Sequence, residues 1–320
     1  MNAAYINRMS GNLDLALEIY EIAADLAHQV KAYEKANMCY GNIAMIHTNR
    51  GEHEISSRYF LAALDLCKEW GNQEMILQRM FDAANVYERI PDYEAAAEIT
   101  MQKHEFGLKI GDYASAVRDL NNLGQIYHDI EDYPKSIRQY LNGIKLAEEH
   151  GVNDEFYHLY QNLGTAYRNN GDYGQAVQTL NKAIEYAKES KHKEQIEWSY
   201  GSLAITYLKQ EDFEKAIDYR KKGLEIATEI ENLAHEIMHL KGLVELYENK
   251  SDFENAWEYR KLLRRAEEEK RNIEQEKEYT TPYEGKIEDL FPTDEKYTFL
   301  VGAGISMNPP SNLSSARLIV

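Results

Sequence analysis

Apolar and polar residues follow the period of an α-helix along most of the chain. Residues 157–189 show this most clearly, because two apolar faces flank a short break at Gly171-Asp172-Tyr173. The first face has its members at i, i+3, i+4 and i+7: Tyr160, Leu163, Gly164 and Tyr167. The second face follows the break: Ala176, Leu180, Ala183 and Ile184. The pattern predicts two antiparallel helices that cross closely where small residues meet.

The break between paired helices recurs every 40 residues without an insertion. Its copies begin at the following residues: Gly11, Gly51, Pro91, Glu131, Gly171, Glu211 and Ser251. Three further glycines mark the other ends of hairpins, where a helix C-terminus favours a left-handed residue: Gly71, Gly111 and Gly151. Such a strict period predicts a solenoid of helical hairpins, with six full repeats after a partial first one. A solenoid of this kind is a binding surface in which no residue need be catalytic.

The spacing of tyrosines and small residues resembles the tetratricopeptide repeat, in an extended form with a 40-residue period. A tyrosine ends the first helix of successive repeats: Tyr87, Tyr127, Tyr167, Tyr207 and Tyr247. A small residue precedes it: Ala44, Ala84, Gly124, Gly164 and Ala204. The resemblance covers residues 1–278 and implies an all-α, right-handed solenoid. At this period the tyrosines are expected to pack between hairpins and not to form a stacking platform.

In arrays of this family the first helix of each hairpin lines a concave groove. Matching the pattern residue by residue places these side chains in it: Asn85, Arg118, Asn121, Gln125, His128, His158, Gln161 and Arg168. Amides and arginines suit an extended peptide, whose backbone offers both donors and acceptors. The resemblance therefore implies a protein or peptide partner in the groove, although each position could also be an ordinary solvated one.

Both ends of the array depart from the repeat. The helix predicted from Leu13 to about Val30 takes the second-helix position, and residues 1–10 are too short for a full partner helix. Its uncovered apolar face predicts either a start further upstream or contact with another chain. The charged segment 264–279 is expected to be a solvated helix, and residues 279–296 a linker. Self-association through these two ends is one reading of the pattern.

Charge and composition narrow the class of partner. The net charge of −18 argues against nucleic acid or an anionic membrane as the main partner. No run of residues has the length and apolarity of a membrane helix, and no secretory signal is visible. Cys39 and Cys67 lack metal-ligand spacing, and their number does not suggest a disulfide framework. These features predict a cytoplasmic protein. We also predict that it has no metal site, because the histidines His104, His128 and His158 lie on different helices.

The last residues begin a different pattern. Tyr297–Val301 is a short β-forming run, followed at once by Gly302-Ala303-Gly304-Ile305-Ser306 and a helix start near Asn312. Strand, glycine loop and helix form the first unit of a doubly wound nucleotide-binding fold, and residues 297–320 are expected to be this short βα segment. Met307 stands where a third glycine would complete the dinucleotide fingerprint.

The phrase FLVGAGIS followed by PPSNL resembles the start of the sirtuin-like NAD-binding family. The resemblance implies that Gly302, Ala303, Gly304 and Ser306 would lie against NAD in a complete domain. Asn308-Pro309-Pro310-Ser311 replaces the family's Pro-Asp-Phe-Arg element, so the chain looks more like divergent sirtuin-like proteins of bacterial immunity, which consume NAD. The family's catalytic asparagine and histidine have no counterpart in these 320 residues.

Three functions follow as expectations. The first is a sensor array forming the N-terminal part of a larger protein with an NAD-consuming effector, of the kind used in antiviral defence. The second is a stand-alone adaptor or scaffold without enzymatic activity, and the third is self-association. In each case we predict that the chain as given is not an enzyme and holds no cofactor.

Overall fold

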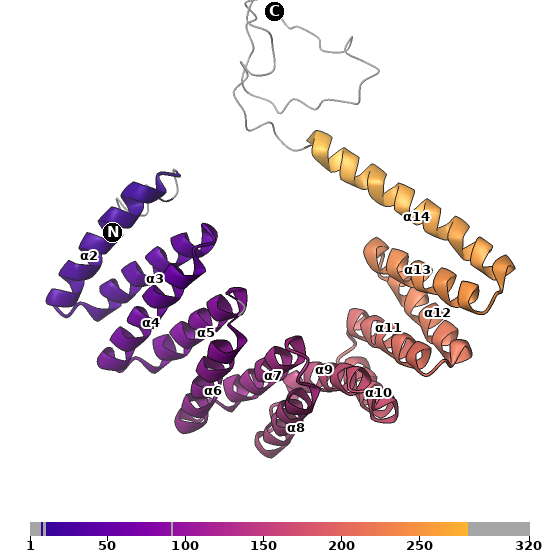
Figure 1. Cartoon of the computed structure of the whole chain (residues 1–320), viewed down its shortest axis with the longest axis horizontal. Helices are drawn as coiled ribbons and strands as arrows, with labels where there is room; N and C mark the ends of the chain where they lie inside the picture. Colours follow the sequence, from indigo (N-terminus) through magenta and orange to yellow (C-terminus); the bar gives the residue numbers. More distant parts are fainter. Residues whose placement is uncertain (1–7, 9–10, 91, 281–320) are drawn as a thin grey trace, which may run out of the picture. The chain divides into compact units, whose positions relative to one another are not determined.

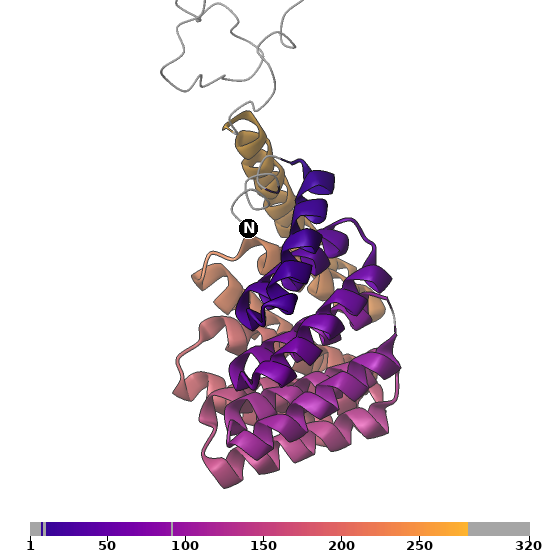
Figure 2. The same cartoon turned by 90° about the vertical axis from the view of Figure 1, so that its left-hand side faces the viewer.

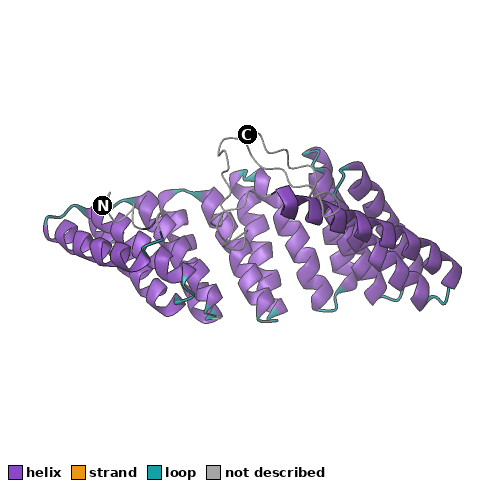
Figure 3. Ribbon diagram, turned by 90° about the horizontal axis from the view of Figure 1, so that it is seen from above, coloured by secondary structure: helices purple, strands orange, loops and turns teal. Residues whose placement is uncertain are grey.

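The described part of the chain is an all-helical array. The computed structural model describes residue 8, residues 11–90 and residues 92–280, which form thirteen α-helices and one short 3-10 helix, η1 (Asn153–Glu155) (Figure 1). No strand occurs among these residues (Figure 3). The first-position helices, called A helices below, are α3 (Tyr33–Asn49), α5 (Gln73–Arg89), α7 (Tyr113–Asp129), α9 (Phe156–Asn169), α11 (Lys193–Lys209) and α13 (Leu233–Asn249). The second-position helices, the B helices, are α2 (Leu13–Gln29), α4 (His53–Trp70), α6 (Tyr93–Ile110), α8 (Tyr133–His150), α10 (Tyr173–Glu189), α12 (Phe213–Glu229) and α14 (Phe253–Thr280).

The chain divides into two compact units. Unit 1 runs to Asp212 and contains α2 to α11, while unit 2 begins at Phe213 and contains α12 to α14. In unit 1, helices that follow one another in sequence pack side by side (Figure 2), and the A helix α9 also contacts the A helices α7 and α11. From α2 onward the described helices alternate between B and A positions. The predicted partial first repeat stays a prediction, because residues 1–7, 9 and 10 lie outside the described residues. The handedness of the array stays a prediction.

Apart from the turn at residue 91, which lies outside the described residues, each turn has a residue in the left-handed region of backbone space. Gly71, Gly111 and Gly151 have φ values of 74°, 78° and 69°. Glu131 and Glu211, at the position that Gly171 occupies in its own repeat, adopt the same conformation with φ of 60°. This conformation is strained for residues with a Cβ, so the packing of the hairpins holds the turn where the sequence lacks glycine.

Three aspartates of the repeated turn, Asp92, Asp132 and Asp252, cap the B helices that follow them, whereas Asp172 makes no such bond. The carboxylates of Asp92 and Asp132 accept hydrogen bonds from the backbone N–H of Ala95 (3.0 Å) and Lys135 (3.2 Å). Each bond satisfies a donor that the first helical turn leaves unpaired. The preceding turn is closed by backbone bonds such as Asp132 N–H to the Tyr127 carbonyl, 2.8 Å. The turn motif of the sequence is thus a helix stop followed by a helix start.

The core of unit 1 lies between successive hairpins. One cluster around α8 and α9 joins Tyr140, Leu159 and Leu163, and the rings of Tyr160 and Tyr186 stack with centroids 5.5 Å apart. The tyrosines that end the A helices are half-buried or buried, as expected of packing residues. Their backbone carbonyls accept the turn hydrogen bonds, so they mark the point where each hairpin closes.

The charged segment from Arg264 is helical, as predicted, because α14 continues to Thr280. It is not solvated throughout: Ala266 is buried against Ile237 and Leu240 of α13, and Lys241 Nζ lies 3.1 Å from Glu267 Oε1. From Glu268 to Gln275 its side chains are exposed. The linker and the βα segment predicted over residues 279–320 fall almost entirely outside the described residues.

Candidate functional site

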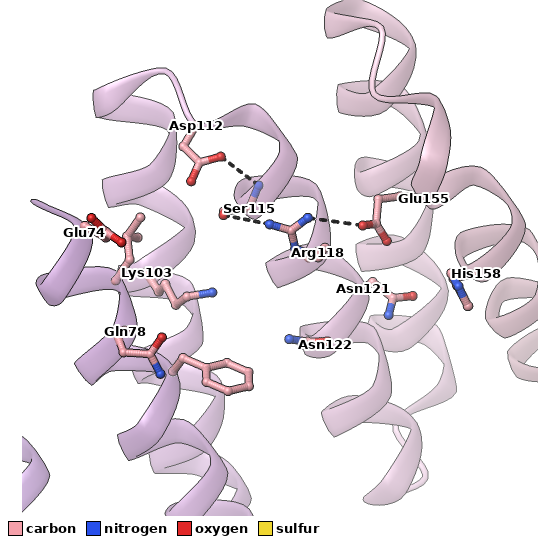
Figure 4. A pocket seen from close by; sticks show the side chains of 12 residues that line it. Glu74, Gln78, Lys103, Asp112, Ser115, Arg118, Asn121, Asn122, Glu155 and His158 are labelled. Atoms are coloured by element: carbon pink, nitrogen blue, oxygen red, sulfur yellow. Dashed lines mark hydrogen bonds and ion pairs between the residues drawn. The ribbon is translucent and has the colours of Figure 1, made fainter. Parts of the chain in front are cut away.

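An open groove of about 610 Å³ runs along unit 1 beside the A helices α5, α7 and α9 (Figure 4). Three of the residues predicted to line a groove are brought together in it: Arg118, Asn121 and His158. The other lining residues are Glu74, Leu77, Gln78, Phe81, Lys103, Asp112, Ser115, Asn122 and Glu155. Three of the eight predicted groove residues therefore line a depression in unit 1, and its use as a binding face stays a prediction.

Arg118 stands at the centre of the groove. Its guanidinium donates a hydrogen bond to Ser115 Oγ, 3.0 Å, and lies 3.5 Å from Glu155 Oε1 of η1. Ser115 is itself fixed, because its backbone N–H donates to the capping carboxylate of Asp112, 3.1 Å. The Arg118 side chain remains 53% exposed, so N–H groups that it does not use for Ser115 and Glu155 are open to a ligand. A guanidinium held in this way can bind a carbonyl or carboxylate of a ligand.

A buried ion pair forms one wall. Lys103 of α6 binds Asp119 of α7, whose side chain is fully buried. Burial raises the pKa of the Asp119 carboxyl, and the nearby Lys103 ammonium opposes that rise. The ammonium of Lys103 also lies 5.7 Å from the centroid of the Phe81 ring, which is 42% exposed. The wall thus presents an aromatic face next to a cation whose charge is already neutralised.

Amide side chains line the groove along α7. Asn162 Nδ2 of α9 donates to Asn121 Oδ1, 3.0 Å, which leaves the Asn121 amide N–H groups directed elsewhere. Asn122, half-buried, makes no side-chain hydrogen bond within the described part of the chain. His158 is exposed, and its ring meets the ring of Tyr157 edge-on, with centroids 5.1 Å apart. These groups offer donors and acceptors of the kind that a peptide backbone requires.

Three other predicted residues form a separate polar group at the far ends of α7 and α9. Gln125 Nε2 donates to Asp129 Oδ1, 2.7 Å, and His128 Nε2 lies 2.8 Å from Asn169 Nδ2. Arg168 Nε donates to Asn169 Oδ1, 3.2 Å, and burial lowers the pKa of its guanidinium. The structure thus links Gln125, His128 and Arg168 to neighbouring side chains and places none of them on the groove wall.

Gln161 and Asn85 also lie away from the groove wall. Gln161 is buried; its amide donates to Ser202 Oγ, 2.7 Å, and accepts from Ser199 Oγ, 2.8 Å. Both bonds reach the next A helix, α11, so this side chain joins two repeats and is not free to bind a ligand. Asn85 is half-buried on α5 and does not line the groove.

Several lining residues were not predicted, although the repeat points to some of them. Gln78 and Phe81 lie 40 residues before Arg118 and Asn121, and so occupy the same positions on α5. Lys103 could not have been found in this way, because it lies on a B helix and enters the groove through its pairing with Asp119.

The four residues expected against NAD, namely Gly302, Ala303, Gly304 and Ser306, lie outside the described residues. Within the described ranges, no three His, Cys, Asp or Glu side chains gather as a metal site would require. Among the helices described, none has the length and apolarity needed to cross a membrane.

Comparison with known proteins matches the repeats. Models of the tetratricopeptide repeat match residues 38–69 and 154–229, the second of which includes His158 and the helices around it. No curated protein sequence matches the chain.

Solved structures share the fold at low sequence identity. BtubC from P. vanneervenii is 14% identical, with a TM-score of 0.55; the match covers 68% of this chain and 91% of BtubC. The apo form of RapI is 15% identical, with a TM-score of 0.52 and coverage of 85% and 97%. A signal transduction ATPase with numerous domains and a tetratricopeptide-repeat sensor, from Pyrococcus horikoshii, is 18% identical with a TM-score of 0.59. That match covers 78% of this chain and 42% of the ATPase. The hairpins, the repeat matches and these folds together show that the chain carries a tetratricopeptide-repeat array.

Proposed function

We propose that the groove between α5 and α9 binds an extended segment of a partner protein. The observation that carries this proposal is the placement of Arg118 and the amides of Asn121 and Asn122 on one open wall. An extended peptide has unpaired backbone N–H and C=O groups on both sides. An amide side chain can accept a hydrogen bond from the N–H groups and donate one to the C=O groups.

Apolar side chains continue the same face on neighbouring A helices. Met38 of α3 and Trp198 of α11 hold the repeat position of Arg118, and both are about half exposed, at 46% and 49%. Exposed apolar side chains at matched positions mark a surface that contacts a partner. The ligand is therefore a segment with a polar centre and apolar side chains toward its ends.

The test is selection from a displayed library of random peptides, followed by affinity measurement on the full chain. Selected peptides should lose at least roughly tenfold in affinity with Arg118→Ala/Asn122→Ala, since a charged hydrogen bond contributes about 1.5–3 kcal/mol. The matched control is Arg138→Ala, an exposed arginine on α8 outside the groove. A library that yields no binder, or peptides that bind the double variant as tightly as the wild type, would contradict the proposal.

We further propose that the array is the sensor of a larger protein whose effector begins at Tyr297 and consumes NAD. The support is the Gly302-Ala303-Gly304 loop after a β-forming run, in the order that a dinucleotide site requires. The Pyrococcus ATPase named above joins a tetratricopeptide-repeat sensor to a nucleotide-using domain in one chain, which is the arrangement proposed here.

This second proposal is tested in the product of the native gene. Gly304→Trp should abolish NAD binding, because a bulky side chain blocks the approach of a pyrophosphate to the loop backbone. Ile230→Trp, in the turn before α13, is the control for an added tryptophan. Unchanged NAD binding in the Gly304 variant, or a gene that stops at residue 320, would leave the adaptor function as the better account.

A further inference from the structure

The outer face of α2 carries an exposed apolar stripe. Leu15, Ile22 and Leu26 fall at i, i+7 and i+11, and Ile22 and Leu26 are 55% and 57% exposed. At the position of Ile22, the B helices from α4 to α12 carry small or polar residues (Ala62, Gln102, Asn142, Lys182 and Lys222), and α14 carries Leu262. The position of Leu26 is apolar in every B helix and buried at Leu66 of α4, so in α2 a packing position of the repeat is exposed. An apolar row of this kind on a water-facing helix is the mark of a contact surface.

Uncompensated negative charge borders this stripe. Helix α2 contains four acidic residues and no lysine or arginine. Asp14 binds Arg50 at 2.7 Å, and Glu21 accepts a hydrogen bond from the Tyr59 hydroxyl at 2.9 Å. Glu18 and Asp25, seven residues apart on the edge of the stripe, pair with no cation in the described ranges. The α2 face therefore favours a partner that is both apolar and basic.

Helix α14 presents such a face. Phe253 and Trp257, at i and i+4, are 70% and 54% exposed. The Arg264 guanidinium lies 6.0 Å from the centre of the Trp257 ring, and Arg265 pairs with no carboxylate in the part of the chain that the structure describes. Within residues 260–265 there are four cations and no acid. Arg260 pairs with Glu248 and Lys261 with Glu258, so Arg264 and Arg265 supply the positive charge of this face.

The position of Arg264 supports this assignment. In α8 and α10 the equivalent residues are Ile144 and Ile184, which are buried in unit 1. In α14 an arginine replaces the apolar residue at this repeat position. The face of α14 thus combines the aromatic contact area of Phe253 and Trp257 with positive charge, which is the complement of α2.

We propose that α14 of one copy of this chain docks on α2 of another copy, head to tail. Trp257 and Phe253 would cover Ile22 and Leu26, while Arg264 and Arg265 would meet Glu18 and Asp25. A desolvated aromatic residue next to an arginine is the usual composition of a strong contact point between proteins. Because each copy carries one face of each kind, the contact is heterologous, and it continues from copy to copy unless the assembly closes into a ring.

The test measures the mass of the full chain by light scattering in a dilution series. The average molar mass of the wild type should rise with protein concentration. Added salt should reduce this rise, because charges contribute to the contact. Ile22→Asn and Trp257→Ala should each weaken association by roughly tenfold or more. Both side chains are more than half exposed, so neither change disturbs the core.

A mixture of the two variants tests directly whether α14 of one copy contacts α2 of another. The Ile22 variant keeps an intact α14 and the Trp257 variant keeps an intact α2, so an equal mixture should form pairs of chains and nothing larger. Leu141→Asn on α8, 45% exposed, is the matched control and should assemble like the wild type. A monomeric wild type, a Trp257 variant that associates normally, or a mixture that forms no pairs would each overturn the proposal.

Discussion

Glycine at the crossing points of hairpins has a steric cause that can be stated residue by residue. A Cβ at Gly164 on α9 would lie 2.7 Å from Leu180 Cγ on α10. At Gly174 on α10, by contrast, a Cβ would meet nothing within 4 Å. Substitution by alanine should therefore change the free energy of unfolding in opposite directions at the two glycines.

We expect Gly164→Ala to lower the free energy of unfolding by about 1–3 kcal/mol, the usual cost of overpacking a core. Gly174→Ala should raise it by up to about 1 kcal/mol, because alanine is the better helix former. Urea denaturation followed by circular dichroism measures both. If the two variants shift the midpoint in the same direction, close helix crossing is not the reason for Gly164.

At the residue scale, the sequence predicted which helix face a side chain lies on better than whether that side chain is free to bind a ligand. The resemblance to the tetratricopeptide repeat implied that Arg118, Asn121 and His158 share one face, and all three line the groove. Gln161 has the same repeat position as Asn121, yet it is buried because α11 supplies Ser199 and Ser202 as partners. The hydrogen-bond partners of a side chain on one A helix depend on how the next A helix packs against it. The pattern within a single helix does not contain that information.

At the scale of the element, turns determine where each helix begins and ends. The prediction of helix ends from Gly111 and Gly151 was confirmed by their left-handed φ values. The same turn conformation at Glu131 and Glu211 shows that the hairpin, and not the residue type, imposes it. Helix α14 is different, because Ala266 packs on α13 while the charged pattern around it suggested solvent on every side.

The buried pair between α6 and α7 gives a test at this scale. Lys103→Met should lower the free energy of unfolding by about 3–5 kcal/mol, because it leaves the Asp119 carboxylate buried without a partner. The double variant Lys103→Met/Asp119→Leu should recover most of that loss, since no uncompensated charge remains. Thermal and urea denaturation of the single and double variants give the coupling between the two residues.

A double variant as unstable as the single one would show that the two helices need the charges themselves. Arg50→Met, which breaks the exposed pair with Asp14, is the control for losing a surface ion pair. It should change the free energy of unfolding by no more than about 1 kcal/mol, as exposed pairs do.

At the scale of the whole molecule, the two proposed interactions draw on different units. The groove lies within unit 1, between Glu74 and His158. The head-to-tail contact needs α2 from unit 1 of one copy and α14 from unit 2 of another. In repeat arrays each hairpin is stabilised mainly by its neighbours, so removing one end leaves distant hairpins folded.

A chain that ends at Asp212 should therefore separate the two functions. We expect it to keep the helical circular dichroism of unit 1 and to bind groove-selected peptides within about threefold of the full chain, because repeats beyond the nearest neighbour contribute little. Light scattering should show it as a monomer, since it lacks α14. When it is added to the full chain, its α2 should dock on the free α14 at the end of each assembly and prevent the addition of further copies. If the shortened chain still forms larger assemblies, the contact surface lies within unit 1. If it loses peptide binding while remaining helical, the groove depends on α12 to α14, and the ligand spans more of the array than α5 to α9.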